Sequence, residues 1–205
     1  MSFVDELLNK SKQANKTIVL CEGEDKRVVE AASKIVKDGI AKIILIGTKE
    51  ECESVAPGID LTGIQIVDPA TSSETDKYAE LLFKAREGKI NKKTGNPEYA
   101  TVEDAKNYIL KDRTMFGALI LKAGDADGFV SGACHSTANT MRPAFQIIKT
   151  APGAKLVSAF FLMIVPNCEY GHNGIFAFGD CAIEQNPEPE KLASIAASTC
   201  ESFKT

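Results

Sequence analysis

The chain has 205 residues, of which 44% are hydrophobic and 25% charged, and its formal net charge is −4 at pH 7. This composition is typical of a folded globular protein with one large domain or two small ones, and it excludes a disordered chain. The negative net charge argues against a general nucleic-acid-binding surface, although it leaves room for a local basic pocket that binds a phosphorylated ligand.

The sequence also predicts a compartment and argues against metal centres. The N-terminal residues Met-Ser-Phe-Val-Asp-Glu-Leu-Leu carry acidic groups where a secretory signal would be positively charged, so we expect a cytoplasmic protein. The longest apolar run, 156–166, is shorter than the ~20 residues of a membrane-spanning helix, so we expect a buried strand and no membrane partner. Six widely spread cysteines without a Cys-x-x-Cys pair, and only two histidines, predict neither a metal site nor a disulfide framework.

Strands and helices alternate in the first third of the chain. We expect a short helix near the N-terminus, capped by Ser2. Apolar runs predict strands, and helical spacing predicts helices, in the order strand 16–22, helix from Asp25, strand 43–46, helix 49–55 and strand 64–67. This alternation predicts an α/β fold in which helices flank a parallel sheet, and ligands of such folds usually bind beyond the carboxyl ends of the strands.

Four charged residues follow the first predicted strand: Glu22, Glu24, Asp25 and Arg27. They lie at a carboxyl end, where a parallel sheet often binds its ligand. A structural role fits them as well, because acidic groups cap helix starts and a neighbouring arginine can form a local ion pair. We prefer the structural role and assign these residues no chemistry.

The middle of the chain predicts three more helices. A charged amphipathic helix covers 74–86, and the turn-forming, lysine-rich segment 88–97 after it predicts a surface loop. Thr101 begins a capping box that opens a helix to 109. The strongly apolar segment 115–123 predicts a buried helix that ends before a glycine.

A polar connection follows the strand that is predicted to end at Val130. Pro143 belongs in the first turn of a helix, so Thr140 becomes the expected N-cap and Arg142 lies beside the positive helix end. The expected anion ligands are Ser131, Ser136, Thr137, Thr140 and Arg142. An ordinary turn, in which the hydroxyls satisfy local backbone groups, fits the spacing equally well.

The last quarter of the chain starts a new pattern. The segment 150–154 is rich in turn formers and predicts a domain boundary, after which we expect strands over 156–165 and 174–183 and a helix over 188–203. His172 in a loop and Asp180 on a strand receive no role. Cys134 and His135 could be proposed as nucleophile and base. The side chains of adjacent residues in a bent loop seldom point at each other, so we assign no catalytic role to these two residues.

The segments DGFVSGACHSTANTMRPA at 127–144 and QIIKT at 146–150 resemble the phosphate acetyltransferase (phosphotransacetylase) family, which includes the phosphate butyryltransferases. The likeness runs over essentially the whole chain. It implies a two-domain α/β fold with an isocitrate/isopropylmalate dehydrogenase-like architecture. Residues 1–149 would form the N-terminal domain with the anion-binding loop, and 150–205 would begin a second, incomplete domain of a chain truncated at its C-terminus.

The resemblance also implies a reaction, the reversible transfer of an acetyl group between coenzyme A and phosphate that gives acetyl phosphate. Coenzyme A would be a substrate rather than a bound cofactor, and a homodimer or higher homo-oligomer is expected. Arg86 matches the family arginine that meets the phosphate end of coenzyme A, whereas its position alone suggests a solvated cation at a helix end. The family's catalytic aspartate, serine and arginine have no matching position before Thr205, which leaves the activity of this chain alone open.

Two alternatives remain at this point. A phosphate butyryltransferase would need a roomier acyl pocket that the sequence does not delimit. A non-catalytic module could keep the anion site and bind coenzyme A or acetyl phosphate without turnover.

Overall fold

The computed structural model describes residues 3–150, 152, 154 and 156–204. The predicted cap at Ser2 lies outside these residues. The chain divides into two compact units, Met1–Lys149 and Thr150–Thr205, and each is described by itself.

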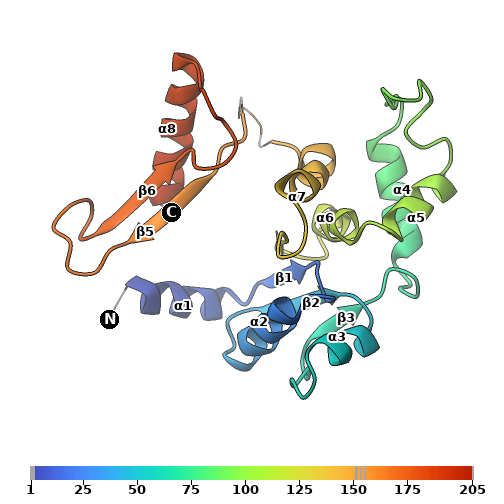
Figure 1. Cartoon of the computed structure of the whole chain (residues 1–205), viewed down its shortest axis with the longest axis horizontal. Coiled ribbons are helices and arrows are strands. Elements are labelled where there is room, and N and C mark those ends of the chain that lie inside the picture. The colour runs from blue at the N-terminus through green and yellow to red at the C-terminus, as the bar shows by residue number, and fades with distance from the viewer. Residues whose placement is uncertain (1–2, 151, 153, 155, 205) are drawn as a thin grey trace. The chain divides into compact units, whose positions relative to one another are not determined.

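The first unit is built on a parallel sheet of four strands (Figure 1). The strands are β1 (Thr17–Leu20), β2 (Lys42–Ile46), β3 (Gln65–Val67) and β4 (Gly128–Val130). Their order in the sheet is β3-β2-β1-β4, so β4 returns from far along the chain to lie beside β1. In the register of this pair, Leu20 lies opposite Val130, which brings the segments that follow the two strands together at one edge. The predicted α/β class with a parallel sheet flanked by helices is confirmed.

Helices connect and cover these strands. They are α1 (Phe3–Ala14), α2 (Lys26–Lys37), α3 (Lys49–Val55), α4 (Thr75–Ala85), α5 (Val102–Ile109), α6 (Arg113–Ala123), α7 (Thr137–Pro143) and the π-helix η1 (Ala144–Ile148). Most begin at a side-chain cap, because a free helix start leaves backbone N–H groups without partners. Asp25 caps α2, Thr48 caps α3 and Asp112 caps α6, while Thr101 and Asp104 form the predicted capping box of α5.

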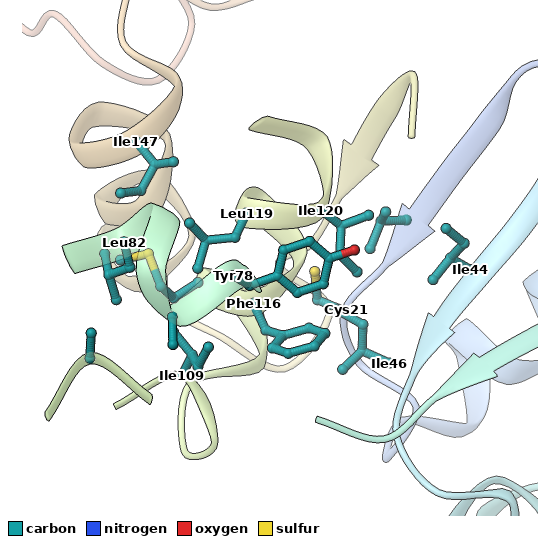
Figure 2. Close-up of a cluster of buried hydrophobic side chains, with 14 residues drawn as sticks. Cys21, Ile44, Ile46, Tyr78, Leu82, Ile109, Phe116, Leu119, Ile120 and Ile147 are labelled. Carbon is teal, nitrogen blue, oxygen red and sulfur yellow. The ribbon is translucent and has the colours of Figure 1, made fainter. Parts of the chain in front are cut away.

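Alternating side chains of β2 divide the core into two layers. Ile44 and Ile46 pack into a cluster with α4, α5, α6 and η1, in which Tyr78 and Phe116 stack edge to face with ring centroids 5.2 Å apart (Figure 2). Ile43 and Leu45 point to the opposite face and pack with residues of α2 and α3. A strand that is covered on both faces needs apolar residues at every position, which explains its unbroken apolar run. The helix α6 is buried along most of its length, as its composition predicts.

The second unit is small and leaves apolar surface exposed. It contains β5 (Phe160–Ile164), β6 (Ile175–Gly179) and α8 (Pro189–Lys204), and the two strands pair antiparallel. The expectation of a buried strand in the run 156–166 is wrong, because the large side chains of β5 are 38–57% exposed. Among the described residues, β5 has one partner strand, and α8 packs against β6. Within the same described part of the chain, no helix has the length and apolar character that crossing a membrane requires.

Candidate functional site

The connection from β4 to α7 wraps around a buried carboxylate, Glu22, which follows β1. Glu22 is 1% exposed. Its oxygens accept hydrogen bonds from the backbone N–H of Gly132 at 3.0 and 3.1 Å, of Ala133 at 2.9 Å and of Cys134 at 3.0 Å. The Nδ1 of His135 lies 2.7 Å from Glu22 Oε1 and is assigned as a further donor, because an ionised carboxylate can only accept. The loop is therefore organised by an anion that belongs to the protein.

These hydrogen bonds determine the protonation of Glu22. Burial acts to raise its pKa, but the bonds from the loop outweigh burial and lower the pKa to about 2. Glu22 is ionised at neutral pH, and the backbone N–H groups that could have bound an external phosphate are already occupied. Sequence reasoning missed this role. The available signal was that the carboxyl ends of neighbouring parallel strands meet, but the pairing of β1 with β4 is not visible in the sequence.

The structural role predicted for the turn after β1 is confirmed for Asp25 and Arg27. Asp25 accepts from the backbone N–H of Arg27 and caps α2, and Arg27 Nη2 lies 2.7 Å from Asp25 Oδ2. The same nitrogen donates to the carbonyl of Ala133 at 2.7 Å. This turn therefore also supports the loop after β4.

The helix after the loop begins earlier than expected. Ser136, not Thr140, is its N-cap, because Ser136 Oγ accepts from the backbone N–H of Asn139 at 3.3 Å. Pro143 ends α7 instead of starting it, so the predicted start is wrong. A proline cannot donate to the carbonyl four residues before it. The chain accommodates Pro143 by changing to a π-helix, in which the N–H of Lys149 bonds to the carbonyl of Ala144 at 2.8 Å.

Arg142 consequently lies in the last turn of α7, away from the positive helix end. It donates to Asn139 Oδ1, and its Nη1 lies 3.9 Å from Asp112 Oδ2. Asp112 also accepts from the Tyr108 hydroxyl at 2.8 Å. Arg142 is thus tethered on the side of α7 that faces the start of α6 and the end of α5.

The predicted hydroxyl ligands have different surroundings. Ser131 Oγ and Thr140 Oγ1 are buried and have no hydrogen-bond partner among the residues that the structure describes. Ser136 is exposed and uses its oxygen as the helix cap, and Thr137 is exposed at the first position of α7. Buried hydroxyls without a partner are unfavourable, so Ser131 and Thr140 are the least satisfied of the predicted hydroxyl ligands.

Arg86 lies at the C-cap of α4 and is held by Glu98. Its Nε and Nη2 donate to the two carboxylate oxygens of Glu98, each at 2.8 Å. The side chain is 14% exposed, so the interpretation of Arg86 as a solvated cation is wrong. The hydrogen bond to Glu98 raises the pKa of Arg86.

Arg86 and Arg142 line the same cavity of about 700 Å³, although they lie far apart in the sequence. The other basic groups in its lining are Lys89, Lys92 and Lys93, and Glu98 is its one acidic residue. Tyr99 and Tyr108 give the cavity aromatic walls. The predicted hydroxyl residues of the loop are not part of this lining. The expected site therefore consists of a basic cavity and a separate loop, joined through Arg142.

Cys134 and His135 do approach each other, with 3.6 Å between Sγ and Nδ1, so the geometric argument against them is wrong. The chemistry still opposes a nucleophilic cysteine. Partial desolvation of the sulfur, and then the carboxylates of Glu24 and Glu22, raise the pKa of Cys134 to about 12, although the residue as a whole is exposed. A thiol that stays protonated at neutral pH is a poor nucleophile.

The two polar residues in the second unit behave as ordinary structural groups. Asp180 follows the end of β6 instead of lying on a strand, and it accepts from the backbone N–H of Ala182 at 2.8 Å and of Ile183 at 3.0 Å. His172 is exposed and forms an isolated bridge with Ile175.

The comparisons with known proteins agree with one another. The family model described as Phosphate acetyl/butaryl transferase matches residues 2–205. The phosphate acetyltransferase of Acetivibrio thermocellus is 48% identical over 100% of this chain and 58% of its own length, and that of Thermoanaerobacterium thermosaccharolyticum is 46% identical over 100% and 60%. A crystal structure of a phosphotransacetylase from Streptococcus pyogenes superposes with a TM-score of 0.83 at 38% identity, and covers 100% of this chain and 60% of its own.

The chain therefore spans about 60% of the length of the relatives that it matches. The match extends through both compact units and includes the loop after β4 and the cavity that contains Arg86 and Arg142. On these grounds the chain belongs to the phosphate acetyl/butyryl transferase family.

Proposed function

We propose that the protein is a phosphate acetyltransferase, which transfers an acetyl group reversibly between coenzyme A and phosphate. The observation that carries this proposal is the basic cavity, in which Arg86 and Arg142 converge with three lysines around one carboxylate. Coenzyme A carries several phosphate charges, and a cavity with this excess of cations suits it. The named relatives are phosphate acetyltransferases, which favours acetyl over butyryl transfer.

Coenzyme A would enter the cavity by its phosphate end. The guanidinium of Arg86 is planar and presents two parallel donors, and a phosphate group accepts the same fork that Glu98 accepts now. A ligand phosphate would therefore compete with Glu98 for Arg86. The lysines of the loop 88–97 add charge around the ligand without fixing its orientation.

Acetyl phosphate would bind at the loop beside the cavity. Its phosphate oxygens would accept from the unpartnered hydroxyls of Ser131 and Thr140 and from Arg142. Ser136 and Thr137 are exposed nearby on the same segment and would add two hydroxyl donors. The backbone N–H groups that Glu22 occupies take no part in this binding.

In the reaction, the thiolate sulfur of coenzyme A forms a bond to the acetyl carbon, and the bond from that carbon to the phosphate oxygen breaks. Phosphate leaves with the bonding electron pair, and the thiol proton passes to a base. Glu22 is a poor base because its pKa is about 2, and Cys134 holds its own proton. We therefore assign the base to neither residue. The family resemblance implies a catalytic aspartate, for which this chain has no matching position.

The same resemblance supports the remaining features of the proposal. Residues 1–149 would form the N-terminal domain and 150–205 would begin a second domain of a two-domain, dehydrogenase-like architecture. The resemblance also implies a homodimer or higher oligomer with coenzyme A, acetyl phosphate and inorganic phosphate as ligands. The acidic N-terminal residues separately favour the cytoplasm.

Calorimetric titration of the 205-residue chain with coenzyme A and with acetyl phosphate tests the two sites separately. Arg86→Gln should weaken coenzyme A binding by about 1.5–3 kcal/mol, roughly tenfold or more, because a charge-assisted hydrogen-bonded pair is lost. Arg142→Lys should weaken acetyl phosphate binding, because lysine lacks the planar fork. The control is Lys34→Gln, which removes a charge from an exposed position on α2. It should change neither the affinity for coenzyme A nor the affinity for acetyl phosphate. Undiminished binding in both arginine variants would contradict the proposal.

An assay of acetyl-CoA formation, with acetyl phosphate compared against butyryl phosphate, tests the reaction. We expect acetyl phosphate to be preferred wherever turnover occurs. Turnover by the 205-residue chain at a rate normal for enzymes would show that the base lies within it. Tight binding without any transfer activity in the whole enzyme would favour the non-catalytic module.

A further inference from the structure

Four side chains that can bind metal ions gather where β1 and β4 end. Glu22 and Glu24 follow β1, and Cys134 and His135 follow β4, its parallel neighbour. The ligand atoms of Glu22, Cys134 and His135 all lie within 4.8 Å of one another. Glu24 Oε1 lies 3.6 Å from Cys134 Sγ. One sulfur, one ring nitrogen and one carboxylate oxygen thus meet at one place, and a second carboxylate, that of Glu24, contacts the sulfur.

The distances from the sulfur agree with tetrahedral coordination. A tetrahedral ion with bonds of about 2.3 Å to sulfur and about 2.0 Å to nitrogen or oxygen holds the sulfur about 3.5 Å from each other ligand atom. Cys134 Sγ lies 3.5 Å from Glu22 Oε1, 3.6 Å from Glu24 Oε1 and 3.6 Å from His135 Nδ1. The sulfur is therefore already at coordination distance from its three prospective co-ligands.

Two adjustments are needed for tetrahedral coordination. Glu24 Oε1 lies outside the group of ligand atoms that are all within 4.8 Å of one another, so the Glu24 carboxylate must move toward Glu22 and His135. His135 Nδ1 and Glu22 Oε1 are 2.7 Å apart, which is a hydrogen-bond distance, whereas two ligands of a tetrahedral ion would be about 3.3 Å apart. An ion that replaces the proton between them would move the ring by a few tenths of an ångström. His135 is half-buried in a loop, and Glu22 is fixed by three backbone N–H groups, so the ring is the group that moves.

The ligand types select the metal. Mg²⁺ and Ca²⁺ prefer oxygen ligands, whereas a thiolate combined with imidazole and carboxylate suits Zn²⁺. The surrounding contacts resemble the outer support that zinc sites use. Arg113 binds the second oxygen of Glu24 at 2.6 Å and leaves Oε1 directed at Cys134, while the loop N–H groups hold Glu22.

We propose that Glu22, Glu24, Cys134 and His135 form a binding site for one Zn²⁺ ion. Binding would release the thiol proton of Cys134 to solvent and shift the imidazole proton from Nδ1 to Nε2, so that sulfur and Nδ1 are both free to coordinate. The carboxylates of Glu22 and Glu24, which lie beside the sulfur, are the groups that attract the dication. The ion would join the end of β1 to the loop after β4. This proposal does not depend on acetyl transfer.

The test is a titration of the tag-free, metal-free, phosphine-reduced 205-residue chain with Zn²⁺ by calorimetry. A second titration with Co²⁺ reports sulfur coordination through its thiolate-to-metal absorption band. We expect one equivalent to bind with this band. Cys134→Ser and His135→Asn should each weaken binding by more than the roughly 10–100-fold that loss of an outer-sphere partner costs. Both side chains lie in the loop outside the hydrophobic core, so the folded state should survive.

The chain supplies matched controls for both ligands. Cys200 is another exposed cysteine, and His172 is the only other histidine. Cys200→Ser and His172→Asn should bind Zn²⁺ as the unmodified chain does, and circular dichroism should show all four variants folded. Absence of stoichiometric binding in the unmodified chain would overturn the proposal. The proposal would also be overturned if Cys134→Ser and His135→Asn bound Zn²⁺ as tightly as the unmodified chain. It would likewise be overturned if Cys200→Ser and His172→Asn lost as much Zn²⁺ affinity as these two variants.

Discussion

Glu22 illustrates how one buried residue can connect two distant segments. Its carboxylate is almost completely removed from solvent, yet each oxygen accepts hydrogen bonds from the loop between β4 and α7. Without those bonds an ionised carboxylate at this position would be strongly unfavourable. The backbone N–H groups of the loop stabilise the ionised carboxylate, and the carboxylate in turn holds the loop in place. The stability of the fold should therefore depend on the charge of Glu22.

We predict that Glu22→Gln destabilises the protein at pH 7 and removes part of its acid sensitivity. The folded-state pKa is about 2, against an ordinary value of 4.5, so ionised Glu22 stabilises the fold above pH 4.5 and this contribution falls as the pH approaches 2. By pH 3 the loss amounts to about 2 kcal/mol in the unmodified chain. Urea unfolding at pH 7 and pH 3 should show the difference between the two proteins shrinking by that amount.

Glu80→Gln is the control for this measurement, because Glu80 is an exposed glutamate on α4. It should change the free energy of unfolding little at either pH. A Glu22→Gln variant that keeps the full pH dependence of the unmodified chain would show that another group is responsible.

Glu98 is a second informative residue, because it occupies the guanidinium that we assign to coenzyme A. We predict that Glu98→Gln strengthens coenzyme A binding by about 1 kcal/mol, roughly fivefold, since the ligand phosphate no longer displaces a charged competitor. Calorimetry on the two proteins measures the difference. Weaker binding in Glu98→Gln would instead mean that Glu98 holds Arg86 in its binding orientation.

At the scale of elements, the start of α7 is where local rules predict the wrong N-cap. A proline three residues after Thr140 favours a helix that starts at Thr140. The structure starts the helix at Ser136 and accommodates Pro143 by changing to η1. Local sequence propensity does not predict this change from an α-helix to a π-helix. The burial of Ile147 in the core stabilises the π-helix.

We predict that Ser136→Ala lowers the free energy of unfolding by about 1 kcal/mol, the usual cost of a lost N-cap. Thr140→Val should be neutral or stabilising, because it replaces an unpartnered buried hydroxyl by a methyl group of the same size. Chemical denaturation of the two variants checks both outcomes. A larger loss in Thr140→Val than in Ser136→Ala would contradict the assigned cap.

Elements with strong local signals could be predicted from the sequence, and features that depend on distant pairing could not. The strands β1, β2 and β3 and the helices α2 to α6 lie where apolar periodicity and caps predict them, because the same residues form the core and the ends. The general position of the loop after β4 follows from its composition. The contact with Glu22 and the pairing of Arg86 with Glu98 depend on tertiary structure, and no local pattern indicates either.

At the scale of the whole molecule, the two units differ in how well they bury their apolar residues. The first unit has packed layers on both faces of its sheet, whereas the second leaves β5 exposed along its whole length. The sequence of β5 has the apolar run of a buried strand, and the run alone does not reveal how many neighbours cover it. An exposed apolar strand is a site at which chains associate.

We therefore predict that the 205-residue chain self-associates through β5. Phe161 has the largest exposed fraction of the strand, 57%, and Phe161→Lys should reduce association because a charge on the strand opposes pairing with another copy. Tyr170→Lys is the control, since Tyr170 is an exposed aromatic residue in the loop between β5 and β6. Sedimentation velocity at protein concentrations from about 1 µM to about 1 mM should show larger species for the unmodified chain and for Tyr170→Lys, and fewer for Phe161→Lys. A monomer throughout this range would show that β5 does not mediate association.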